Sequence, residues 1–180
     1  MAITQSDILW KLSVTSGSAG NSTSGTPAGS LGKYISTTQL SGTTLNNLFD
    51  DISGDENAAS TVDYRCIFIH NAHASLTYQS PVIWISSEVS GGASIAIAVD
   101  GTAASAIGSA SAQAAQIANE TTAPTGTGGF SSPTSKATGL SLGSIAAGSC
   151  KAVWIRRTAA NNAALNNDGV TFAVEGDTAA

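Results

Sequence analysis

The chain has 180 residues and a net charge of −5, and only 11% of its residues are charged. In ordinary globular domains about a quarter of the residues are charged. The seven Lys and Arg residues of this chain are scattered along it, apart from Arg156-Arg157. This composition excludes a nucleic-acid partner that is held by phosphate contacts. The length allows one domain with an extension, or at most two small domains.

The N-terminus, residues 1–7, has neither a basic start nor a following apolar core, so we expect no signal peptide. The most apolar long run, residues 93–118, contains Asp100 and two glycines and is not expected to span a membrane. These features predict a soluble protein that is made in a cytoplasm and has no membrane partner.

The first predicted element is a strand at residues 8–14, with Ile8, Trp10, Leu12 and Val14 on one side. Residues 15–30 are almost wholly Ser, Gly, Thr, Ala, Asn and Pro, which predicts a loop or flexible arm. The strand is therefore either a docking element on a loose tether or part of the sheet of its own domain. We accordingly divide the chain into a strand and arm, 1–35, and a β-sandwich domain, 36–180. The candidate partner-binding residues are Ile8, Leu9, Trp10, Lys11 and Leu12.

The next segments predict a short strand at 34–40 and a single helical turn at 45–49. Leu45, Leu48 and Phe49 have helical spacing behind a Thr cap. The acidic residues 50–56 follow this turn, and we expect them to form a solvent-exposed loop.

From residue 63 onward the sequence alternates as strands do. In 64–70, Tyr64, Cys66 and Phe68 fall on one face and Arg65, Ile67 and Ile69 on the other, which predicts a central strand that is covered on both faces. Further strands are expected at 76–78, 81–86, 95–99, 140–145, 151–157 and 170–175, and residues 102–116 form a long loop before a strand near Ile117. The fold class is all-β, an antiparallel, jelly-roll-like β-sandwich with an extended N-terminal strand or arm.

No catalytic, metal or cofactor site is predicted, and we do not expect an enzyme. Residues 139–143 match the G-x-S-x-G pattern around Ser141, but both histidines precede it and the flanks favour strand over helix. His70 and His73 lack an evident third metal ligand. Cys66 and Cys150 are either a disulfide or two buried thiols, and the second is favoured. One of the arginines 156 and 157 either pairs with an internal carboxylate such as Asp63 or forms a salt bridge between subunits.

Six segments taken together resemble a family of small virion structural proteins of tailed bacteriophages: 45–51, 64–71, 82–86, 117–120, 153–157 and 174–178. The similarity extends from about residue 40 to the C-terminus. It implies a particle component of β-sandwich type, and within that family we expect a capsid decoration (cement) protein. Its expected partners are the major capsid protein and further copies of itself in a homotrimer, and its expected location is the capsid surface of the virion.

Two other functions stay open. The first is a tail, baseplate or fibre-associated component that binds another tail protein or a host glycan, for which Tyr34, Tyr78 and Trp84 are candidate stacking residues. The second is a hydrolase that uses Ser141. The resemblance carries over no catalytic residues.

Overall fold

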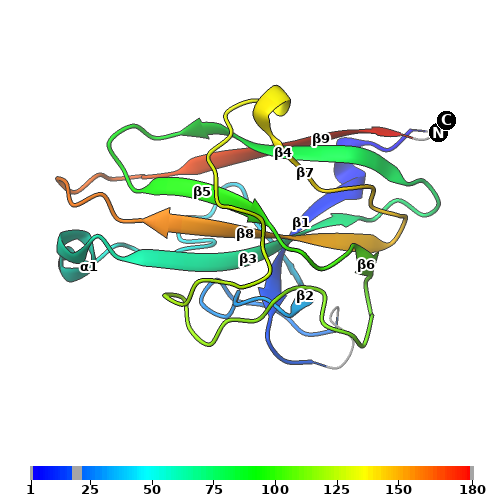
Figure 1. The fold of residues 1–180 in the computed structure, drawn as a ribbon, viewed down its shortest axis with the longest axis horizontal. Helices are drawn as coiled ribbons and strands as arrows, with labels where there is room; N and C mark the ends of the chain where they lie inside the picture. Colours follow the sequence, from blue (N-terminus) through cyan, green and yellow to red (C-terminus); the bar gives the residue numbers. More distant parts are fainter. Residues whose placement is uncertain (1, 18–21, 179–180) are drawn as a thin grey trace.

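The computed structural model describes residues 2–17 and 22–178, and it consists of two antiparallel sheets that pack face to face (Figure 1). The larger sheet has the order β2-β1-β3-β8-β5, and β6 pairs with the end of β8. Its strands are β1 (Ile8–Val14), β2 (Tyr34–Gln39), β3 (Val62–Asn71), β5 (Ser94–Val99), β6 (Ser105–Ala106) and β8 (Ser149–Thr158). The smaller sheet has the order β7-β4-β9, with β4 (Tyr78–Glu88), β7 (Leu140–Ser141) and β9 (Val170–Thr178). The sandwich-like, antiparallel all-β class is therefore confirmed.

The larger sheet is buried on both faces. Its inner face and the smaller sheet enclose one apolar cluster, to which β3 contributes Ile67 and Ile69. Its outer face carries a second cluster with Cys66 and Phe68 from β3, and this cluster is covered by parts of the long segment between β6 and β7. The alternation predicted for this central strand is confirmed, because neighbouring residues of a strand point to opposite faces.

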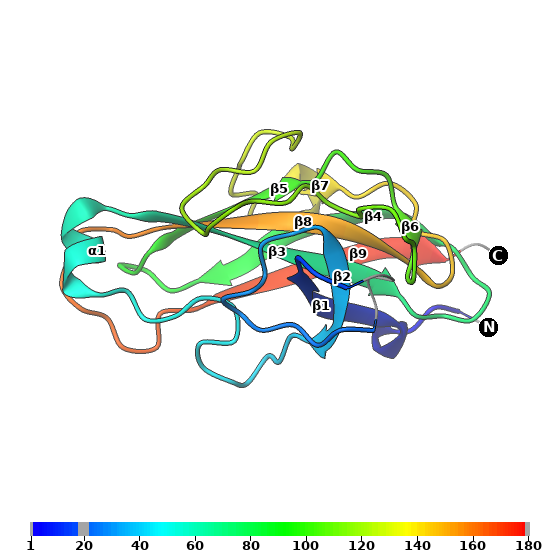
Figure 2. The ribbon, with the colours of Figure 1, turned by 90° about the horizontal axis from the view of Figure 1, so that it is seen from below.

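The predicted N-terminal strand exists as β1, and it lies inside the larger sheet. One edge of β1 pairs with β3 along Ile8–Leu12, and the other edge pairs with β2 from Lys11 onward. Of the two alternatives for this strand, the structure shows the second, in which it completes the sheet of its own domain (Figure 2). Part of the arm that follows it, residues 18–21, lies outside the described residues.

Two local predictions are wrong. Residues 45–49 form no helix. Leu48 is buried in the inter-sheet core, and the Phe49 ring lies against the guanidinium groups of Arg65 and Arg157, at 5.5 and 4.7 Å from the ring centroid. These tertiary contacts override the helical spacing. A helix, α1 (Gly54–Ala59), begins instead within the expected acidic loop 50–56 and continues beyond it, because Ser53 and Glu56 make a capping box at its start.

The strand expected near Ile117 is absent from the described chain. The N–H of Ile117 donates to the carbonyl of Leu31, and its side chain is buried in the second cluster. Gln116 makes only a single bridge, to Gly32. The segments 76–78 and 81–86 are not two strands as expected. Tyr78 and the whole of 81–86 belong to one long strand, β4, with a register shift between Gln79 and Val82.

One side of the sandwich is closed by the segment 127–133. The N–H of Ile97 in β5 donates to the carbonyl of Ser131 at 2.8 Å, and the N–H of Ile85 in β4 donates to the carbonyl of Pro133 at 2.8 Å. This segment therefore ties β5, the edge strand of the larger sheet, to β4 of the smaller sheet. Two 3-10 turns complete the fold, η1 (Gln5–Asp7) and η2 (Lys136–Thr138). No helix within the described ranges is long and apolar enough to cross a membrane.

Candidate functional site

The residues considered for catalysis and metal binding do not come together. Ser141 is an exposed residue of β7, opposite Val82 of β4, and it lies on no strand-to-helix turn. The Nδ1 atom of His73 accepts hydrogen bonds from the N–H groups of Ser75 and Leu76 at 3.1 and 3.0 Å, so this imidazole caps its own turn. In the described part of the chain, no three His, Cys, Asp or Glu residues are grouped as metal ligands.

His70 is buried at the end of β3, and neither of its ring nitrogens has a hydrogen-bond partner among the described residues. Burial lowers the pKa of His70 from 6.5 to about 4, and the charge of Lys11 adds to this shift. The imidazole is therefore neutral at physiological pH and is part of the packing of the larger sheet.

The two cysteines are buried free thiols, as favoured from the sequence. Cys66 pairs in register with Trp154, and Cys150 pairs with His70, four residues further along the ladder. This offset separates the two cysteines by about 13 Å along the strands, whereas disulfides need Cα atoms within about 7 Å of one another. Burial raises the pKa of Cys150 to about 12 and raises that of Cys66 well above its usual value.

Arg157 pairs with an internal carboxylate, which confirms that alternative for the arginine pair. Its Nη2 atom lies 2.7 Å from Asp63 Oδ2, and both side chains are buried. The same guanidinium also contacts the backbone carbonyl and the carboxylate of Asp50. The pair holds the segment before α1 onto the larger sheet.

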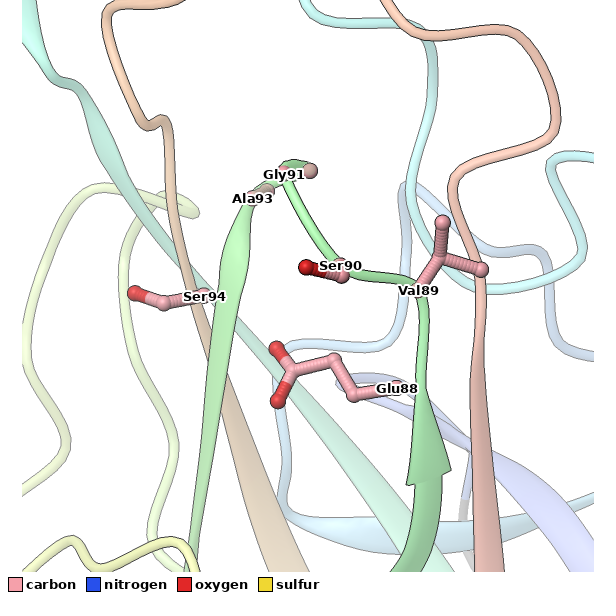
Figure 3. Close-up of a pocket in the computed structure, with 7 residues that line it drawn as sticks. Glu88, Val89, Ser90, Gly91, Ala93 and Ser94 are labelled. Atoms are coloured by element: carbon pink, nitrogen blue, oxygen red, sulfur yellow. The ribbon is translucent and has the colours of Figure 1, made fainter.

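The loop that connects β4 to β5 forms a small pocket of about 270 Å³, lined by residues 88–94 (Figure 3). Two carboxylates, Glu88 of the lining and Asp168, hold the backbone of this loop. Glu88 accepts a hydrogen bond from the N–H of Ile95 at 2.7 Å, and Asp168 accepts one from the N–H of Ala93 at 2.6 Å. Because both carboxylates bind backbone N–H groups, the pocket is a structural feature of this loop.

The feature that fits a binding role is a groove between the start of β1 and the strand β9, which we name the β1–β9 groove. It has a volume of about 410 Å³. Its lining comprises Ile3, Thr4, Gln5, Ile8 and Trp10 on one side, and Tyr78, Phe172, Ala173, Val174, Glu175 and Gly176 on the other. The groove lies on the side of the sandwich opposite the closing segment 127–133.

The floor of the groove is apolar. The rings of Trp10 and Phe172 are stacked, with centroids 6.4 Å apart and an angle of 22° between their planes. Ile3 and Ile8 lie beside them as half-buried side chains that pack on the inter-sheet core. The two sheets therefore meet here through side chains, without backbone hydrogen bonds between β1 and β9.

One wall of the groove is the open edge of β9. In the described ranges β9 pairs with β4 alone. The N–H of Ile85 points away from β9, to Pro133, and Tyr78 exchanges its hydrogen bonds with Ile145 on the same far side. In an antiparallel ladder the N–H and C=O of one residue point the same way. The partners of Ile85 and Tyr78 in β9, Phe172 and Thr178, therefore direct their backbone groups to the open edge.

The same alternation extends along β9, so Val174 also directs its N–H and C=O groups into the groove. Gly176 points the same way, and its backbone N–H lies at the phenol group of Tyr78. Gly176 has a further constraint. An added Cβ there would lie 2.8 Å from the carbonyl oxygen of Gln79, so the register shift in β4 requires a glycine.

Acidic residues lie at and next to the rim of the groove, and Glu175 is the one that belongs to its lining. Glu175 and Asp177 are exposed residues of β9, and Asp7 lies in η1, immediately before β1. Glu175 pairs with Lys136 at 2.6 Å, and this bridge is exposed on both sides. Asp177 has no ion-pair partner within residues 2–17 and 22–178.

The structure places the predicted partner-binding residues on two opposite faces of the larger sheet. Ile8 and Trp10 line the groove, and Leu12 is buried in the core between the sheets. Leu9 and Lys11 pair with His70 and Phe68, which places them on the opposite face of the sheet. A role of all five residues in partner binding stays a prediction.

The aromatic residues considered for glycan stacking are mostly inside the molecule. Tyr34 and Tyr78 are buried, and only Trp84, on β4, is partly exposed. The open edge of β9 was not recognised from the sequence. The alternation of Val170, Phe172 and Val174 predicts a half-buried strand, but it contains no signal for the position of that strand in the sheet.

The chain matches no family model, no curated protein and no solved structure.

Proposed function

We propose that the protein is a bacteriophage virion structural protein that binds the outer surface of the major capsid protein shell and stabilises it. In this proposal the chain is a cement protein of jelly-roll type, and it acts as a homotrimer on the capsid surface. The β1–β9 groove is its attachment site. The six segments that resemble virion structural proteins support the class.

The observation that carries the proposal is the open edge of β9 beside the half-buried Trp10. A strand edge offers main-chain hydrogen bonds to a partner, and partly buried aromatic residues contribute strongly to interface energies. A molecular surface that is poor in charge supports the same role, since it can be covered without desolvating many ionised groups.

Copy number and shell stability test the proposal. Purified particles of the phage that encodes the chain should contain the protein in a number that follows the lattice of the shell. Shells that lack the protein should lose their integrity at a lower temperature, and adding the purified protein should restore it. A protein that is absent from the particle, or that leaves shell stability unchanged, would contradict the proposal.

The alternative role in a tail, baseplate or fibre gives a different result in the same measurement. A copy number that follows the symmetry of the tail, together with no binding to isolated shells, would replace the capsid role by the tail role.

A further inference from the structure

We propose that the open edge of β9 binds an extended segment of the partner that alternates apolar residues with Lys or Arg. The inference rests on the attachment role proposed above for the same groove, and it specifies the chemistry of the partner. The observation behind it is the juxtaposition of three features: unpaired backbone groups on β9, an apolar floor beside them, and an acidic rim.

The backbone of β9 sets the conformation of the bound segment. Phe172, Val174 and Gly176 direct their N–H and C=O groups to the open edge, at every second residue. An extended segment matches this spacing, because alternate residues of a strand direct their own groups to one side. The smaller sheet would thereby gain a fourth strand next to β9.

The apolar floor of the groove determines the chemistry of every second side chain of the bound segment. The apolar side chains of β9, Phe172 and Val174, face the core between the sheets. A strand added beside β9 places every second side chain on that same face, where Ile8 and Trp10 are only half-buried. Apolar residues at these positions would remove this surface from water.

The acidic rim determines the chemistry of the remaining side chains of the bound segment. The remaining side chains of the added strand lie on the outer face, beside Glu175 and Asp177 of β9. Directly opposite residues of neighbouring strands have Cβ atoms about 5 Å apart, close enough for charged pairs to interact. Lys136 already pairs with Glu175, so Asp177 is the carboxylate that a basic residue of the partner would meet.

Two of the registers that pair this edge with a second copy of the chain bring acidic side chains together. In an antiparallel pair of two β9 edges with Val174 opposite Gly176, Glu175 faces Glu175 of the other copy. Moving the pairing so that Val174 faces itself leaves the two Glu175 side chains as diagonal neighbours. Like charges across strands are destabilising and protect sheet edges from self-association.

Two synthetic peptides of equal length test the inference on the isotope-labelled full chain. One alternates Val with Lys and the other alternates Val with Glu, and both have capped ends. The Val–Lys peptide should shift the amide NMR signals of Phe172, Val174 and Gly176. The Val–Glu peptide should bind at least about tenfold more weakly.

Two variants separate the main-chain contribution from the charge. Val174→Pro removes an N–H from the open edge and leaves the ladder to β4 intact, and it should weaken the Val–Lys peptide about tenfold. Asp177→Lys should weaken the Val–Lys peptide and strengthen the Val–Glu peptide. Asp51→Lys, in the exposed loop before α1, changes the net charge equally and should change neither. If Val174→Pro fails to fold, the amide shifts of the unchanged chain still decide the matter.

Four outcomes would overturn the inference: binding of neither peptide, equal binding of both, shifts confined to other residues, or edge signals that move with protein concentration alone. The last outcome would make a second copy the occupant.

A failure of the attachment role can be distinguished from a failure of this inference. If the unchanged protein does not bind particles, the proposed function is wrong, and the peptides still decide the chemistry of the edge. If folded Val174→Pro binds particles normally, the attachment role stands and the edge is not its site.

Discussion

Arg157 and Asp63 form a buried ion pair at the centre of a larger group of side chains. The guanidinium also lies against the ring of Phe49 and contacts Asp50. Removing one partner of such a pair leaves the other charge buried without compensation, which destabilises a fold more than the loss of an exposed pair.

Asp63→Ala should therefore lower the free energy of unfolding by about 3 kcal/mol, measured by urea denaturation. Lys136→Ala is the matched control, because it removes the exposed bridge to Glu175 and should cost less than about 1 kcal/mol. Equal, small effects of both substitutions would show that the Arg157 pair is not a significant source of stability.

His70 makes stability depend on pH in a defined window. Its pKa in the folded protein is about 4, against 6.5 in an exposed imidazole. Between these values the unfolded chain takes up a proton that the folded chain does not. Stability should thus be complete above about pH 6.5 and should fall as the pH is lowered towards 4.

Urea midpoints measured from pH 7 to pH 4.5 test this expectation. His70→Gln removes the titrating group, so the slope of the midpoint against pH should flatten across this range. The carboxylates of Asp7 and Glu56 have lowered pKa values, so their contributions are lost as the pH falls below their ordinary values of 3.8 and 4.5, at or below the acid end of this range. A slope that survives His70→Gln would assign the dependence to other groups.

The strand β1 is an inner element, and this determines what its removal does. It pairs with β3 on one edge and β2 on the other, and Leu12 and Val14 are buried. Deleting residues 1–14 would leave the edge of β3 unpaired and the apolar core uncovered.

Such a truncated chain should lose its cooperative thermal transition or melt far below the full chain, as followed by circular dichroism. A test of partner binding by deletion would thus confuse attachment with folding. Point substitutions on the open edge of β9 avoid this difficulty. A truncated chain that melts like the full chain would mean that β1 is dispensable for the fold.

The elements with strict alternation could be predicted from the sequence. Residues 64–70 and 170–174 show apolar side chains at every second position, and both became strands with the predicted faces. The segment 45–49 could not be predicted, because Phe49 is held by two arginines that lie far away in the sequence. Long-range contacts of this kind leave no local signal.

The candidate site, like the fold, can be predicted from the sequence only in part. The sequence predicts a partner-binding role for Trp10 and Ile8 because their strand precedes a loosely tethered arm, and both residues line the groove. The open edge opposite them was missed, because an edge is a property of strand order. Strand order depends on which segments meet in space, and here the first strand and the last strand of the chain meet at one groove.

At the scale of the whole molecule, the two thiols report on the integrity of the sandwich. Cys66 and Cys150 are both buried, and burial raises the pKa of each above its usual value. Thiolates react and thiols do not, so neither residue should react in the folded state.

A thiol-specific aromatic disulfide reagent at pH 8 should consequently modify both cysteines at the rate of global unfolding. In denaturant the reaction should be immediate, and no intramolecular disulfide should form in the folded protein under mild oxidation. Rapid modification of either cysteine without denaturant would indicate local opening of the larger sheet.

The two sides of the sandwich differ in how their sheets are joined. Segment 127–133 fastens β5 to β4 through backbone hydrogen bonds, while β1 and β9 meet only through side chains. A partner strand on β9 would run along the long axis of the molecule, which β9 follows in Figure 1. Tension applied along that axis would load its hydrogen bonds in shear, so that they would have to break together.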